Sequence, residues 1–242
     1  ISDTNRLLLF LNQILFIKMA LLLCIDTSTT HASVALSREA ELIGIKTNQN
    51  QKDHGSFLQP AIKELMQETG FPLTDLQAIA VTSGPGSYTG LRVGFATAKG
   101  LCYALRLPLI TIPTTTVMSA AAVKEIDDAG NFLLCPMIDA RRMEVFTRMY
   151  TVQLDPVSSI GAKILEPGSF ADELNRQPVY FFGDGAAKWQ SICQHPNARF
   201  LKTDWNAANM MHLADVLFRE KHFTSLAYST PDYGKEFYST QL

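Results

Sequence analysis

The stretch at residues 76–100 constrains this chain most, because it joins an apolar run to a helical pattern through a glycine-rich turn. Residues 76–82 form a short and mostly apolar run, which predicts a buried strand. The Gly-Pro-Gly sequence at 84–86 ends that strand, since glycine and proline favour turns. Ser87 is a favourable N-cap for the helix predicted over residues 88–104. The rest of the chain is arranged around this strand, turn and helix.

Two glycines lie one turn apart inside the predicted helix, and an alanine follows in the same row: Gly90, Gly94 and Ala98. Glycine inside a helix costs about 1 kcal/mol relative to alanine. We therefore expect another backbone to pack very close to this row. Anion binding at the preceding turn is the alternative, but a Walker loop needs four residues between its glycines and then Lys-Ser or Lys-Thr. The turn at 84–86 has neither feature, so a packing helix is favoured.

The first half of the chain alternates strands and helices in a definite order. Three strands joined by short turns come first, followed by a helix, a strand, a helix, a strand and a helix. Their ranges are 20–25, 31–37, 40–47, 54–69, 76–82, 88–104, 107–112 and 114–124. A meander followed by alternating elements gives a mixed sheet with helices on its faces. We predict an α/β protein of the actin-like or Hsp70-like (ribonuclease-H-like) fold, with two lobes that each hold a mixed sheet flanked by helices.

A polar break at residues 127–131 marks the predicted boundary between the lobes. We assign residues 19–126 to the first lobe and 127–242 to a second, more degenerate lobe. The second lobe opens on an apolar run ending in Asp139, which echoes the run that ends in Asp26. Residues 152–177 are poorly periodic and predict only loops, one strand and a short helix. The helix predicted at 209–221 has one apolar face and is free to pack back on the first lobe.

The first 18 residues precede the predicted fold and contain an interrupted apolar segment. Residues 7–17 are apolar but interrupted, and they are too short to span a bilayer, which needs about 20 residues. Met19 directly precedes the first predicted strand. We expect translation to start at Met19, with residues 1–18 being a leader or non-native extension. An amphipathic appendage is the alternative.

Composition and charge exclude several classes of protein. The chain has 242 residues, of which 47% are hydrophobic and 18% charged, which is typical of a globular protein. Its net charge is −2 and it has no long basic run, which argues against binding nucleic acid alone through a basic face. Its four cysteines are far apart in sequence, which favours reduced thiols in a cytoplasmic protein.

Asp26 and Asp139 are the candidate chemical residues, because each follows the first strand of its lobe. Kinases of this superfold use such a pair with Mg²⁺ and phosphates, but they also need glycines after each aspartate to cradle phosphate. The residues at 27–30 and 140–142 include no glycine. The alternative is that each aspartate caps its own turn. Arg141 is a third candidate cleft residue, although a solvated or ion-paired arginine is the simpler interpretation.

No catalytic residue or metal ligand is predicted. The five histidines include no pair four residues apart on one helix, the spacing that a helical metal pair requires. There is no Gly-x-Ser-x-Gly sequence of the kind that exposes a nucleophilic serine. These patterns argue against a metallopeptidase and against Ser-His-Asp chemistry.

Residues 83–94, Ser-Gly-Pro-Gly-Ser-Tyr-Thr-Gly-Leu-Arg-Val-Gly, resemble the signature of the glycoprotease-like TsaB (YeaZ) family. This family works in the bacterial biosynthesis of threonylcarbamoyladenosine in tRNA. Tyr88 stands where the family usually has Phe. The segments at 139–145 and 183–186 are also similar to the family. The tail departs from it, because Gly234 follows Tyr233 where the family commonly has Leu.

The resemblance implies a cytoplasmic, non-catalytic protein that binds and supports the catalytic subunit TsaD. It further implies that the ATPase TsaE joins the complex, that tRNA is reached only through the complex, and that the protein forms a homodimer when alone. No cofactor and no membrane contact are implied, and a weak ATP or ADP site with Mg²⁺ at a partner interface is left open. The alternative is an enzyme of the actin-like fold, either a small-molecule kinase or a metallopeptidase. The missing glycines and the missing histidine pair argue against that alternative.

The predicted partner surface lies on the two helices at 54–69 and 88–104, which the resemblance implies pair with two helices of the partner. The first helix has more apolar width than one sheet face needs, and the glycine row allows close approach of a second helix. The predicted partner-binding residues are Phe57, Leu58, Ala61, Ile62, Leu65, Gly90, Gly94 and Ala98. The alternative is that the glycine row packs inward on the sheet and only the first helix is exposed.

Removing residues 1–18 is expected to leave folding intact, because the predicted fold begins at Ala20. The measurement is the thermal unfolding of the full chain beside a chain that starts at Met19. A large loss of melting temperature in the shorter chain would contradict the prediction.

Overall fold

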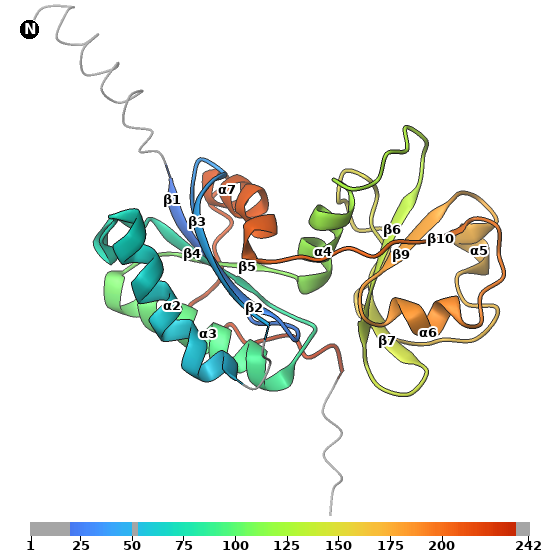
Figure 1. Cartoon of the computed structure of the whole chain (residues 1–242), viewed down its shortest axis with the longest axis horizontal. Coiled ribbons are helices and arrows are strands. Elements are labelled where there is room, and N and C mark those ends of the chain that lie inside the picture. Colours follow the sequence, from blue (N-terminus) through green and yellow to red (C-terminus); the bar gives the residue numbers. More distant parts are fainter. Residues whose placement is uncertain (1–19, 50–52, 236–242) are drawn as a thin grey trace, which may run out of the picture.

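Two five-stranded mixed sheets form the framework of the computed structural model, which describes residues 20–49 and 53–235 (Figure 1). The segment at 1–18 that we interpreted as a leader therefore lies outside the described residues. Each sheet belongs to one lobe, and helices lie against the sheets. None of the helices in the described ranges is long and apolar enough to cross a membrane.

The first sheet has the strand order β3-β2-β1-β4-β5. Its strands are β1 (Leu21–Asp26), β2 (Ala32–Arg38), β3 (Glu41–Asn48), β4 (Ala78–Thr82) and β5 (Leu109–Ile112). β1 pairs antiparallel with β2 and parallel with β4. All six residues of β1 are buried, because its apolar sequence occupies the middle of a sheet that is covered on both faces.

One face of this sheet is covered by α2 (His54–Thr69) and α3 (Tyr88–Leu105), whose apolar side chains join Leu23 and Ile25 in one core cluster. The opposite face is covered by η3 (Ala207–Met210) and α7 (Met211–Arg219), with Ala214 packed beside Leu22 and Cys24. α7 thus returns from the far end of the chain to complete the first lobe. α4 (Thr114–Ala122) contacts both η3 and the second sheet.

The second sheet has the order β10-β9-β6-β7-β8 and repeats the pairing of the first. Its strands are β6 (Leu133–Asp139), β7 (Glu144–Thr147), β8 (Gly161–Ile164), β9 (Val179–Phe182) and β10 (Ala198–Phe200). The central strand β6 pairs antiparallel with β7 and parallel with β9, as β1 does with β2 and β4. This duplication confirms the predicted two-lobed ribonuclease-H-like fold, and it places Asp26 and Asp139 at equivalent strand ends.

Most predicted elements are present with small shifts at their ends. Ser87 does cap α3, since its Oγ accepts the Gly90 N–H at 3.3 Å. The poorly periodic segment contains β8 and the short helix α5 (Ala171–Leu174), as expected. A short helix, α6 (Ala186–Gln190), follows β9. The three-residue strand β10 was not predicted, because so short a run carries no periodic signal.

The glycine row of α3 packs inward, so the predicted partner surface is not formed by its members. A Cβ on Gly90 would lie 2.0 Å from the carbonyl oxygen of Thr27, and one on Gly94 would lie 2.4 Å from the Thr27 hydroxyl. The same hydroxyl donates a hydrogen bond to the Gly90 carbonyl at 2.7 Å. Ala98 is fully buried. The close backbone approach that we expected is therefore made by this chain's own turn after β1.

The apolar side chains of α2 require the same correction. Leu58, Ala61, Ile62 and Leu65 are at most 3% exposed and belong to the core of the first lobe. Phe57 is half-buried against that core. The apolar width of α2 is used by the sheet and by α3, which leaves mainly polar side chains on its outer face.

Replacing Gly90 by Ala is expected to lower the free energy of unfolding by about 2–3 kcal/mol, because the new methyl group would meet a backbone carbonyl that cannot move away cheaply. Gly100 in the same helix is the matched control, since a Cβ there would meet nothing within 4 Å. Gly100→Ala is expected to raise that free energy by up to about 1 kcal/mol. Urea unfolding of both variants measures the difference, and equal stability of the two would show that the Thr27 contact is not tight.

Candidate functional site

A hollow of about 390 Å³ lies between the lobes, at the ends of the central strands. The first lobe lines it with the loop after β1 and the N-terminal end of α3. The second lobe lines it with the β6–β7 hairpin and the turn after β9. A neighbouring hollow of about 550 Å³ shares Thr29, Thr30 and Asp184 with it. This cleft is where an enzyme of the fold would hold its ligand.

Asp26 does not face the cleft, and its prediction as a cleft residue is wrong. It is 2% exposed, and one carboxylate oxygen accepts three hydrogen bonds: from the Ser28 N–H at 3.0 Å, the Ser28 hydroxyl at 2.6 Å and the Thr82 hydroxyl at 2.9 Å. Burial raises the pKa of Asp26, and these hydrogen bonds oppose that shift only in part. Asp26 therefore caps its own turn, the alternative weighed from the sequence.

Asp139 and Arg141 both line the cleft. Partial burial of the Asp139 carboxylate is outweighed by hydrogen bonds from Lys188 Nζ and from the Arg141 N–H, each at 2.6 Å, which lower the pKa of Asp139. Arg141 and Arg142 have φ angles of 70° and 48°. They form the tight turn of the β6–β7 hairpin rather than part of a strand.

Asp184 is a cleft residue that the sequence analysis did not select. Its Oδ1 accepts the Asp139 N–H at 2.8 Å, which ties the turn after β9 to the end of β6. Burial, together with the nearby Asp139 charge, raises the pKa of Asp184. The sequence held a turn signal here, because a glycine comes shortly after β9, at Gly183, and shortly after β4, at Gly84. In the structure both glycines have positive φ.

These contacts occupy the carboxylates of all three aspartates considered for the cleft. Asp26 is covered, Asp139 is paired with Lys188, and Asp184 is hydrogen-bonded to the backbone. Within residues 20–49 and 53–235, no cluster of three or more His, Cys, Asp or Glu side chains could hold a metal ion. The residues present therefore do not fit a magnesium nucleotide of the kind that kinases of this fold use.

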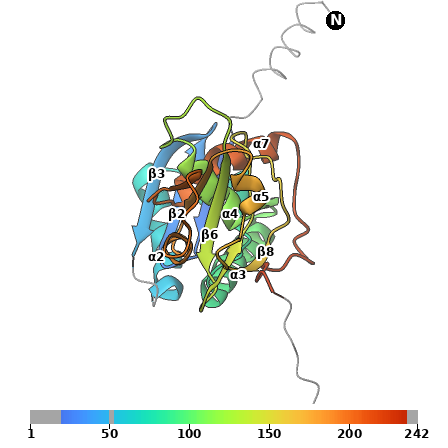
Figure 2. The same ribbon diagram turned by 90° about the vertical axis from the view of Figure 1, so that its right-hand side faces the viewer.

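The C-terminal tail runs along one edge of the molecule (Figure 2), and its contacts pass from the first lobe to the second. Its backbone follows β5 and α3, where the Thr224 N–H donates to Leu109 and the Asp232 N–H donates to Ser83 at 2.7 Å. Lys235, the last described residue, forms an ion pair with Glu144 on β7. The tail therefore ties the two sides of the cleft together.

The structure explains why glycine stands at position 234, where leucine was expected. Its φ is +71°, and a Cβ would lie 2.6 Å from the Phe146 ring and 3.1 Å from Pro85. The preceding Tyr233 packs its ring 4.8 Å from that of Tyr88. Glycine lets the tail pass between the two lobes at this point.

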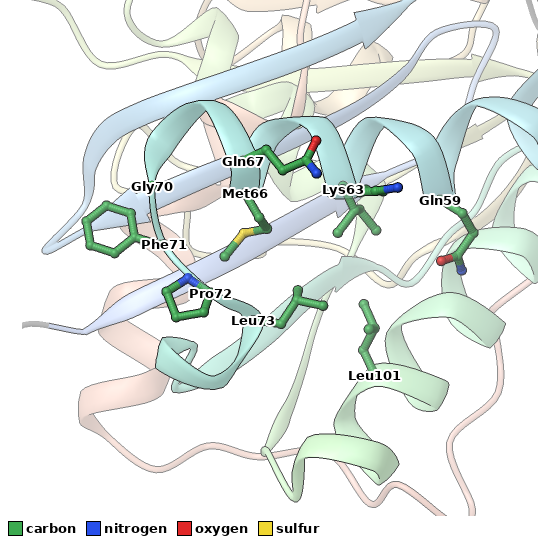
Figure 3. A pocket seen from close by; sticks show the side chains of 10 residues that line it. Gln59, Lys63, Met66, Gln67, Gly70, Phe71, Pro72, Leu73 and Leu101 are labelled. Carbon is green, nitrogen blue, oxygen red and sulfur yellow. The ribbon is translucent and has the colours of Figure 1, made fainter.

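A second hollow, of about 480 Å³, lies between α2, the segment at 70–73 and the C-terminal half of α3 (Figure 3). Met66, Leu73 and Leu101 supply its apolar lining. Gln59, Lys63 and Gln67 from α2 surround it with polar side chains. Of the predicted partner-binding residues, Ile62 is the one that lines this hollow.

Replacing Asp26 by Asn is expected to preserve the fold and to raise stability near pH 7, because the amide oxygen can accept the same three hydrogen bonds without a buried charge. The folded-state pKa of Asp26 lies above its ordinary value of 3.8. Protonated Asp26 therefore stabilises the folded wild type below pH 3.8, and this stabilisation is lost as the pH rises through the folded-state pKa. The stability gap between Asp26→Asn and wild type should therefore widen from about pH 4 to pH 7. Thermal unfolding across this range tests it, and a destabilised variant near pH 7 would contradict it.

Comparison with known proteins gives consistent results over both lobes. The family model described as "TsaD: tRNA N6-adenosine threonylcarbamoyltransferase" matches residues 29–218. The tRNA threonylcarbamoyladenosine biosynthesis protein TsaB of Haemophilus influenzae is 32% identical over 229 residues, which cover 88% of this chain and 92% of that protein. The protein of the same name from Bacillus subtilis is 34% identical over 129 residues, covering 53% of this chain and 54% of that protein.

The solved structure of YeaZ from Pseudomonas aeruginosa shares the fold, with a TM-score of 0.74 and 25% identity, over 89% of this chain and all of that chain. The sequence matches and this structural match agree with the resemblance that residues 83–94 carry. The chain therefore belongs to the TsaB (YeaZ) family of tRNA threonylcarbamoyladenosine biosynthesis proteins.

Proposed function

We propose that this chain is the non-catalytic partner in the threonylcarbamoylation of adenosine next to the anticodon in tRNA, where it binds and supports a TsaD-like catalytic subunit. Its membership of the TsaB family supports the pathway. The observation that carries the non-catalytic role is the state of the cleft, in which Asp26 is buried under three hydrogen bonds and Asp139 is neutralised by Lys188. A kinase or a metallopeptidase would need these groups free for a ligand.

By analogy with the family, we also propose further partners for this chain. A TsaE-like ATPase would join the complex, and tRNA would be brought to it by the catalytic subunit in the cytoplasm. The chain itself would need no cofactor. Any bound ATP or ADP with Mg²⁺ would then lie at a partner interface rather than in the cleft between the lobes.

The partner surface that we propose is the apolar hollow between α2 and the C-terminal half of α3, in place of the buried glycine row. Leu73 and Leu101 are half-buried apolar side chains in this hollow, and Lys63 and Gln67 at its edge are exposed. Apolar anchors filling such a hollow usually supply most of the binding energy of an interface. In the absence of the catalytic subunit, a second copy of the chain would cover the same surface, which gives the homodimer.

Filling this hollow is expected to weaken association with the catalytic subunit by at least about tenfold. Gln59→Trp places a large ring at the edge of the hollow from an exposed position, and Leu101→Gln makes the lining polar. Val216→Asp is the matched control, because Val216 is a 38% exposed apolar residue on α7, on the opposite face of the first sheet.

Co-purification and analytical ultracentrifugation with a TsaD-like subunit measure the effect, and circular dichroism checks folding. Unchanged association of folded Gln59→Trp and Leu101→Gln would refute the proposed surface. Failure of the wild-type chain to associate at all would refute the proposed function.

A further inference from the structure

A line of aromatic and basic side chains follows α3 on the flank that faces the C-terminal tail. Its five members are Tyr88, Arg92, Lys99, Tyr103 and Arg106. Because one helical residue turns about 100°, the four positions inside α3 lie within a sector of about 60°, and Arg106 follows as the left-handed C-cap of the helix. The helix contains no Asp or Glu, so the line is entirely aromatic and cationic.

This line is separate from the hollow proposed as the partner surface. The opposite flank of α3 faces α2, where Gln59 donates to the Thr97 hydroxyl at 3.3 Å and Leu101 lines the hollow. Thr97 and Leu101 are turned roughly 160° from the middle of the line. A ligand on the line and a partner on the hollow can therefore be bound together.

The tail adds an exposed tyrosine, Tyr228, to the exposed Tyr103 of α3. Lys99 Nζ donates to the Ser229 carbonyl at 2.9 Å, which holds the tail against α3. Tyr228 precedes Ser229 and is 88% exposed, whereas Tyr103 lies one turn beyond Lys99 and is 81% exposed. Two almost fully exposed tyrosines therefore lie on the two segments, α3 and the tail, that this hydrogen bond joins.

The other end of the line has the same character. The Arg92 guanidinium lies 4.7 Å from the centre of the Tyr88 ring. The centre of the Tyr233 ring, on the tail, lies 4.8 Å from the centre of the same Tyr88 ring. The sole acidic residue of the described tail from 224 to 235 is Asp232, whose carboxylate accepts the Gly234 N–H at 2.8 Å. Arg92, Lys99 and Arg106 thus face one tail carboxylate along α3, which is 18 residues or about 27 Å long.

We propose that this α3–tail surface binds a single-stranded segment of RNA. Arginine and lysine would contact the phosphates, and the exposed tyrosine rings would stack on bases, the combination by which proteins hold single strands without sequence preference. RNA fits better than a protein partner, because aromatic anchors of protein interfaces sit in packed surroundings, whereas Tyr103 and Tyr228 stand open. The inference extends the proposed function by giving the chain its own RNA contact.

Few cations form the surface and the whole chain carries a net charge of −2, so binding by the isolated chain is weak and strongly salt-dependent. Inside the complex, the surface would add to the RNA contacts of the catalytic subunit. The isolated full chain still suffices for the test when the salt concentration is low.

The experiment is fluorescence anisotropy of the full chain with a labelled, unstructured RNA of about 12 nucleotides at about 50 mM salt. The double variant Tyr103→Ser, Tyr228→Ser is expected to bind about tenfold more weakly, whereas Tyr103→Phe, Tyr228→Phe keeps the ring faces and binds like wild type. Arg106→Gln should weaken binding and reduce the salt slope by about 1. Lys63→Gln on α2 is the charge-matched control and is expected to change nothing.

Wild-type affinity in the double serine variant, or equal weakening by Lys63→Gln, would overturn the proposal. So would a double serine variant that keeps its RNA affinity but loses the catalytic subunit, since the surface would then be a protein interface. Loss of RNA binding with complex formation intact supports it. Failure of the wild-type chain to bind the catalytic subunit would refute the proposed function without changing the RNA result.

Discussion

The contact between the turn after β1 and the helix α3 is the constraint on which the first lobe depends. Thr27 places its carbonyl oxygen and its hydroxyl where a Cβ on Gly90 or Gly94 would be, and the hydroxyl donates to the Gly90 carbonyl. This approach brings the backbone of α3 directly onto the end of the central strand. The position of α3 then determines where the cleft, the hollow beside α2 and the tail can lie.

The same contact explains why the first lobe lacks a phosphate loop. In the turn after β1, Thr27 is buried against α3 and Ser28 is bound to the Asp26 carboxylate. A Cβ on Gly86 would meet the Ser28 carbonyl at 2.0 Å, so the two loops already occupy each other's space. The two loops of the first lobe are therefore packed against each other on their side of the cleft, and the non-catalytic role that we propose rests in part on this packing.

The sequence predicted the fold well where its patterns were long and local. The strand, turn and helix at residues 76–105 were found because apolar run, turn residues and helical period follow one another directly. β10 and the full extent of the β6–β7 turn were not, because short elements depend on tertiary pairing rather than on their own periodicity. For the site, Asp139 and Arg141 line the hollow between the lobes, whereas Asp26 is buried, because the hydrogen bonds that a side chain makes cannot be read from its position after a strand.

The glycine row shows most clearly why a correct observation can lead to a wrong surface. Glycines one turn apart do report a close backbone contact, but the sequence does not say whether that backbone belongs to the same chain. Here the contact is with Thr27, 63 residues earlier than Gly90 in the chain. Burying the glycines inside the lobe turns the flanks of α3 outward instead, one toward the apolar hollow and one toward the tail. A single helix can in this way serve two different partners, because its inner face is fixed by the core and its two flanks differ in chemistry.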